Sequence, residues 1–286
     1  HGVHGYYGPD DSFREAQIAW MARRHHWAIE PDWALQTHGL GNALSVIINA
    51  CSQPGEAVII FSPVYHSFAR IIKANDRRVH ASPMRINDGR FKMDLGALAA
   101  SLTGDEKIMF LCSPHNPGGR VWSAEELRNV ALFCETHDII LVSDEVHHDL
   151  IMPGHSHTIL AKVAPEISRR LITLVATSKT FNIAGIETGS MLIPDPALRQ
   201  RVARVRHAMN ISNNRFGMLM AEAAYRGGDE WLDKLIPYLD ANRRLLNEAI
   251  DGIHGLSVMN LEATYLGWVD FSATGMKRED FIERLC

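Results

Sequence analysis

The chain has 286 residues with 46% hydrophobic and 22% charged side chains, proportions that are typical of a soluble globular protein. Its net charge of −4 gives no reason to expect a nucleic acid or an anionic membrane as a partner. No apolar run approaches the roughly 20 residues that a membrane span requires. The first residues, HGVHGYYGPDD, lack the pattern of a signal peptide, and we expect a cytoplasmic protein.

Cysteine and histidine spacing does not predict a metal site. The four cysteines lack the spacing of a metal site or a disulfide framework, and we expect reduced thiols at Cys51, Cys112, Cys134 and Cys286. Histidines stand close together at His25-His26, His147-His148 and 155–157. Because neighbouring side chains of a strand point to opposite faces, such pairs rarely bind one ion together.

The first informative element is a Gly-x-Gly turn that leads into a helical run at 36–50 (QTHGLGNALSVIINA). Free backbone amides at a helix N-terminus favour an anion such as phosphate, although a simple turn is the commoner use of such glycines. The stretch lacks the full G-x-G-x-x-G fingerprint with its ribose-binding acid, which argues against a nicotinamide cofactor.

Four apolar runs predict buried parallel strands that alternate with helical segments: Ala57–Phe61, Lys107–Cys112, Asp138–Val142 and Leu171–Ala176. Between them, 123–136 predicts an amphipathic helix, and Ser123 precedes Glu126 with the spacing of a capping box. Alternation of strands and helices indicates an α/β domain with a mostly parallel sheet.

Polar or aromatic side chains follow each of these four strands, in the segments SPVYHSF, SPHNPGG, SDEVHHD and TSKTFN. In open α/β sheets, ligands bind at the edge where the strands end, so four such segments in succession predict a site there. A pyridoxal phosphate (PLP) site requires the groups present in these loops. A lysine forms the Schiff base, an aspartate keeps the pyridine nitrogen protonated, an aromatic ring stacks on the cofactor, and amides hold the phosphate.

The motifs SPHNPGG, SDEVHHD and SKTFNIAG, in this order, resemble those of fold-type I PLP enzymes of the class I/II aminotransferase group. Within that group the chain is most similar to the MalY/PatB-type cystathionine β-lyases, also called C–S lyases, from HGVHGY to ATYLGWVDF. The resemblance implies a PLP-binding, transferase-like large domain at 1–232. It also implies an interdomain helix and the start of a small α+β domain at 233–286.

The resemblance assigns roles around the cofactor ring. Lys179 would be the Schiff-base lysine and would later take the Cα proton of the substrate. Asp144 would pair with the pyridine nitrogen, while Asn116 and His147 would hydrogen-bond the 3′-oxygen of the ring. From the residues alone, a turn role for Asn116 and a structural role for His147 stay open.

Further cofactor contacts are implied by the same comparison. Tyr65 would stack on the ring, and the amides of Leu40 and Gly41 with the hydroxyl of Ser178 would hold the phosphate. Tyr6 matches a tyrosine that reaches the phosphate of the neighbouring subunit, which implies a homodimer. A plain packing role is the alternative for both tyrosines.

The sequence departs from the family pattern in two respects. Many aminotransferases have a phosphate-binding arginine eight residues after the lysine, where this chain has Glu187, and the lyase branch does not usually keep that arginine. A carboxylate cannot donate a hydrogen bond to a phosphate and repels it. The family also has a segment before HGVHGY and a stretch after residue 286, which carries the arginine that binds the substrate carboxylate.

Three functions follow as hypotheses. The first is β-elimination from cystathionine or a cysteine S-conjugate, which releases a thiol, pyruvate and ammonia. The alternative is a class I/II aminotransferase, which has the same motifs and uses the same residues to reprotonate the cofactor carbon instead. The third, disfavoured by the presence of Lys179, Asp144 and Asn116, is a regulator with this fold and no catalysis.

Overall fold

A seven-stranded sheet forms the centre of the protein in the computed structural model, which describes residues 11–285. The strand order is β1-β9-β8-β7-β6-β2-β3, and β9 runs antiparallel to both of its neighbours while the other strands share one direction. The strands are β1 Ala34–His38, β2 Ala57–Ser62, β3 Arg78–Pro83, β6 Glu106–Cys112, β7 Ile140–Asp144, β8 Leu171–Val175 and β9 Thr188–Leu192.

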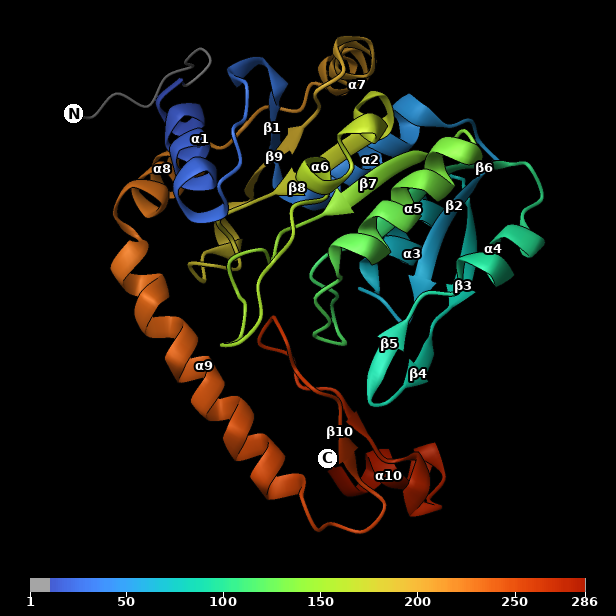
Figure 1. The fold of residues 1–286 in the computed structure, drawn as a ribbon. Helices are drawn as coiled ribbons and strands as arrows, with labels where there is room; N and C mark the ends of the chain where they lie inside the picture. The colour runs from blue at the N-terminus through green and yellow to red at the C-terminus, as the bar shows by residue number, and fades with distance from the viewer. Residues whose placement is uncertain (1–10, 286) are drawn as a thin grey trace.

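Helices cover both faces of this sheet (Figure 1). The helices are α1 Asp11–His25, α2 Gly39–Cys51, α3 Ser67–Ala74, α4 Leu95–Ser101, α5 Ala124–Thr136, α6 Leu160–Val163, α7 Pro196–Ala208, α8 Arg215–Gly227, α9 Asp229–Ile250 and α10 Arg278–Leu285. Within β2, Val58 and Ile60 pack toward α2 and α3, whereas Ile59 and Phe61 pack toward α5. Because both faces are covered, the central strands β2, β6, β7 and β8 are largely apolar instead of alternating with polar residues.

A third cluster of buried side chains lies beside the sheet, where α1 packs against α8. Trp20 of α1 and Tyr225 of α8 are both buried there, with ring centroids 5.8 Å apart. This cluster also includes Val175, at the end of β8. The N-terminal helix is therefore packed close to the strand that leads to Lys179.

The sequence-based elements agree with the structure apart from small shifts. The helix predicted at 123–136 is α5, and its N-cap Ser123 forms the predicted capping box with Glu126. The strand predicted to begin at Asp138 begins instead at Ile140, because Asp138 has φ 58° and belongs to the preceding turn. That strand continues to Asp144, so the predicted site aspartate ends the strand instead of following it.

The chain leaves the sheet region along the 22-residue helix α9, which leads to a small C-terminal part (Figure 1). This part contains the short strands β10 Ser257–Val258 and β11 Val269–Asp270 and the helix α10; the other hairpin, β4 Arg85–Asn87 with β5 Arg90–Lys92, belongs to the large part. The predicted division between residues 232 and 233 falls within α9 and stays a prediction. Across residues 11–285, no helix combines the length and apolar character of a membrane span.

Candidate active site

A cavity of about 470 Å³ lies at the edge of the sheet where the parallel strands end. Eight of the nine predicted cofactor residues line it: Leu40, Gly41, Tyr65, Asn116, Asp144, His147, Ser178 and Lys179. The ninth, Tyr6, lies outside the described residues. The structure therefore brings together side chains from loops spread over about half of the chain, as the strand-end pattern predicted.

The first turn of α2 forms one wall of the cavity. Its N-cap residue, His38, provides no side-chain hydrogen bond to the free amides of this turn. Gly39 has φ 71°, a backbone conformation that favours glycine. The free amides of Leu40 and Gly41 suit a phosphate group.

Asp144 and Lys179 form the charged part of the site. The Asp144 side chain is buried and accepts one hydrogen bond, from the backbone N–H of Val146 at 3.2 Å. Burial raises the pKa of the Asp144 carboxyl to about 6, although that hydrogen bond and the nearby Lys179 charge act in the opposite direction. A cationic partner such as a protonated ring nitrogen would favour the ionised carboxylate.

His147 is buried beside these two residues, and both of its ring nitrogens lack a hydrogen-bond partner among residues 11–285. Burial lowers its pKa to about 3, with a further lowering by Lys179, so the ring is neutral at pH 7. A neutral imidazole carries one N–H donor, and a buried donor without a partner is costly. The unpaired ring suits an acceptor supplied by a bound molecule, as the predicted contact with the 3′-oxygen requires.

The residues present therefore fit PLP. The cavity offers an amine at Lys179, a buried carboxylate at Asp144, an unpaired imidazole at His147 and free amides at the start of α2. Tyr65 lines the cavity and is 38% exposed, so part of its ring surface is accessible for stacking. Their individual roles stay predictions.

Sequence reasoning missed several residues at the site. Arg70 lines the cavity together with Ser67 and Ile71 of α3, and this i, i+3, i+4 spacing was the available signal. Tyr265 lies with its ring centroid 5.6 Å from that of His147, and its neighbour Thr264 has φ 71°. A β-branched residue at positive φ is strained, and local sequence patterns do not reveal such a position.

Glu187 lines the same cavity, at the position where many aminotransferases have their arginine. It has φ 52°, and its carboxylate lies 3.9 Å from the Nε2 atom of His38. The folded cavity therefore has a carboxylate at this position instead of an arginine.

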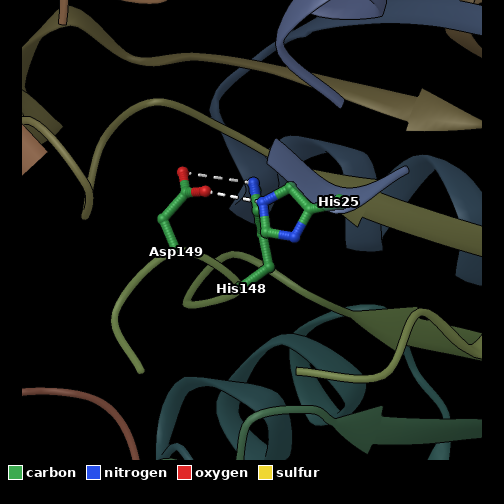
Figure 2. Close-up of side chains that lie close together, drawn as sticks. All are labelled: His25, His148 and Asp149. Carbon is green, nitrogen blue, oxygen red and sulfur yellow. Dashed lines mark hydrogen bonds and ion pairs between the residues drawn. The ribbon is translucent and has the colours of Figure 1, made fainter. Parts of the chain in front are cut away.

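The adjacent histidines of the SDEVHHD motif lie in a turn beyond the end of β7. This turn is closed by backbone hydrogen bonds from His148 to Glu145 and from Leu150 to His147. Only His147 lines the cavity, whereas His148 lies with His25 and Asp149 in a buried cluster behind it (Figure 2).

Comparison with known proteins agrees with this geometry. Cystathionine β-lyase PatB from Bacillus subtilis is 36% identical over all of this chain and 74% of its own length, and Protein MalY from Escherichia coli is 31% identical over 94% and 70%. The crystal structure of cystalysin from Treponema denticola, which contains PLP, matches with a TM-score of 0.94 and 34% identity over 98% of this chain and 72% of its own. A PLP-bound C–S lyase from Staphylococcus hominis matches with a TM-score of 0.89 and 28% identity, over 96% of this chain and 69% of its own.

These similarities confirm the predicted fold, that of the PLP-dependent transferases of fold type I, and the predicted family. The expected cofactor and enzyme class agree with the names of these relatives. The family model for aminotransferases of class I and II matches residues 1–286. The chain belongs to the aminotransferase class I and II family.

Proposed function

We propose that this protein is a PLP-dependent carbon–sulfur β-lyase. It acts on cystathionine or another cysteine S-conjugate and releases a thiol, pyruvate and ammonia. The main support is the cavity in which Lys179, Asp144 and Asn116 meet, in a chain that is 36% identical to a cystathionine β-lyase.

PLP, when bound, accepts the electron pair that remains when the Cα proton of an amino acid is removed. Lys179 is the residue that takes this proton, because its amine is the basic group that lines the cavity next to Asp144. Asp144 holds the ring nitrogen as a buried hydrogen-bond acceptor, which keeps a positive charge at that atom. His147 and Asn116 hydrogen-bond the 3′-oxygen that the ring carries and so hold the ring in place.

The departure of the leaving group distinguishes a lyase from an aminotransferase. In the lyase, the carbon–sulfur bond at Cβ breaks after loss of the Cα proton, and the thiolate takes up a proton as it leaves. Water then hydrolyses the released three-carbon enamine to pyruvate and ammonia. In an aminotransferase, Lys179 would instead deliver that proton to a carbon of the cofactor, and the carbon–sulfur bond would stay intact. Glu187 in the cavity, where many aminotransferases have an arginine, supports the lyase.

We also propose that the working unit is a homodimer, with Tyr6 of one chain directed to the phosphate site of the other. The proposal has its support in the family resemblance of the HGVHGY motif. The cytoplasm is the proposed location, since Cys51, Cys112 and Cys134 are free thiols in the structure.

The test is an assay of pyruvate from L-cystathionine with added PLP and without any keto acid. We expect catalytic pyruvate from the wild-type protein and none from Lys179→Ala. Lys234→Ala is the matched control, because Lys234 is exposed and forms an ion pair with Glu230 on the surface of α9. If no pyruvate forms but an added keto acid is converted to its amino acid, the protein is an aminotransferase and the proposal is wrong.

A further inference from the structure

Three ionisable residues of the SDEVHHD motif do not line the candidate cofactor cavity. Glu145, His148 and Asp149 are buried on the opposite side of the turn from Asp144 and His147. The Glu145 carboxylate accepts hydrogen bonds from the Ser143 hydroxyl and the Leu160 backbone N–H, and it lies 2.8 Å from His157. The proposed reaction uses none of these three side chains.

Asp149 is the centre of the cluster in Figure 2. Its Oδ1 atom lies 2.6 Å from Nε2 of His25, and the indole N–H of Trp20 donates to both oxygens at 3.2 Å. Its Oδ2 atom lies 3.3 Å from Nε2 of His148. Burial alone would raise the pKa of this carboxyl, but His148, His25 and the Thr180 hydroxyl outweigh that effect and hold the pKa below its usual range.

The cluster is connected to the predicted catalytic lysine through one residue. Thr180, which directly follows Lys179, is fully buried, and its hydroxyl donates to Oδ2 of Asp149 at 2.7 Å. Its backbone carbonyl accepts a hydrogen bond from the indole N–H of Trp231 at 3.0 Å. The hydroxyl and the backbone carbonyl of Thr180 are therefore both held, the first by Asp149 and the second by α9.

The same three groups, His25, His148 and Asp149, could also be read as ligands of a metal ion. Two ligand atoms of one tetrahedral zinc ion lie about 3.3 Å apart, given bond lengths of about 2.0 to 2.1 Å. The Asp149 and His25 atoms are only 2.6 Å apart, which is a hydrogen-bond distance. The hydroxyl of Thr180 and the indole of Trp20 already occupy further acceptor positions of the carboxylate.

We propose that Asp149 is a positioning residue for Lys179: it fixes Thr180 and thereby places the lysine amine in the cavity. His25 and Trp20 hold Asp149 from α1, so the N-terminal helix contributes to the geometry of the active site without lining the cavity. The inference rests on the proposed function for the role of Lys179. An error of about 1 Å in the position of a reacting group costs about 100-fold in rate.

The test compares Thr180→Val, which removes the hydroxyl, with Thr180→Ser, which keeps it. Apoprotein is mixed with PLP, whose aldehyde condenses with the Lys179 amine and releases water. Borohydride reduces the resulting C=N bond, and mass spectrometry of the Lys179 peptide then gives the rate of attachment. We expect attachment to be about ten- to 100-fold slower in Thr180→Val and largely restored in Thr180→Ser.

A second measurement separates positioning from a general structural effect. In the Lys179→Ala background, Thr180→Val should leave the equilibrium affinity for PLP unchanged. The proposal would be overturned if Thr180→Val weakened PLP binding in the Lys179→Ala background as much as it slows attachment to Lys179. It would also be overturned if Thr180→Val attached PLP at the wild-type rate, or if Thr180→Ser were as slow as Thr180→Val.

His25→Gln and His80→Gln form a matched pair, because His80 lies 2.7 Å from Glu106 in a similar pair on β3, away from the cavity. We expect slower attachment in the first only, and equal rates would contradict the proposal. Stoichiometric metal in the purified protein would also overturn it. Attachment does not depend on which substrate is cleaved, so failure of the pyruvate assay is a separate outcome.

Discussion

The two sides of the SDEVHHD turn differ in how many hydrogen bonds their buried side chains form. Toward the cavity, within the part of the chain that the structure describes, both ring nitrogens of His147 are unpaired and Asp144 accepts a single backbone hydrogen bond. Behind the turn, Glu145 and Asp149 each accept several hydrogen bonds. The two buried carboxylates behind the turn, Glu145 and Asp149, are thus paired within the chain, whereas Asp144 and His147 keep free positions for partners that a cofactor would supply.

The largest expected effect comes from breaking the paired side. Glu145→Ala should lower the free energy of unfolding by about 3 to 5 kcal/mol, because His157, Ser143 and the Leu160 amide lose a buried partner. Urea denaturation of the apoprotein measures this change. Glu230→Ala, which removes an exposed ion pair with Lys234, should have little effect. A similar loss of unfolding free energy in both variants would show that the buried hydrogen bonds of Glu145 are not its cause.

On the cavity side, Asp144→Asn should stabilise the apoprotein while abolishing lyase activity. The native carboxyl has its pKa raised to about 6, so it retains a proton that the unfolded chain releases near pH 4. The stability of the wild-type apoprotein therefore falls as the pH rises from about 4 to 6, by about 3 kcal/mol from this group alone.

The advantage of Asp144→Asn should accordingly be absent at pH 4 and complete at pH 7, as measured by urea denaturation at both values. An advantage that is the same at both pH values would show that ionisation of Asp144 is not its cause. Addition of PLP should stabilise the wild-type protein more than the variant, since only the carboxylate can hold a positive ring nitrogen.

His147→Phe should raise the stability of the apoprotein by about 1 kcal/mol, because the unpaired ring nitrogens are replaced by carbon. The same change should weaken PLP binding, since the ring N–H is lost. Thermal unfolding with and without PLP measures both effects. A destabilised apoprotein would show that the His147 ring is structural, the alternative that the sequence left open.

The smallest effect is expected far from the turn, at the start of α5. Ser123→Ala should cost about 1 kcal/mol of stability, because the Glu126 amide loses its capping partner. Pyruvate formation should stay at the wild-type level, and Ser123→Asp should recover most of the stability. A large loss of activity in Ser123→Ala would show that the helix cap is coupled to the site.

Local sequence patterns were sufficient for the elements and for most of the candidate site. Continuous apolar runs identify strands buried on both faces, and polar motifs directly after them identify the edge at which a ligand binds. Lys179, Asp144, Asn116 and His147 could be predicted because each stands in such a motif and the motifs resemble one family. The capping box of α5 follows from two residues three positions apart.

Contacts between distant segments were decided only by the tertiary structure. Nothing near Thr180 in the sequence indicates that its hydroxyl meets Asp149, nor that Asp149 is held by Trp20 and His25 of α1. Tyr265 follows α9 in the chain, and its ring contacts that of His147 next to a strained residue, Thr264. Periodicity and motifs report which face or end of an element a residue occupies, whereas the partner across a packed interface depends on how the whole chain closes around the sheet.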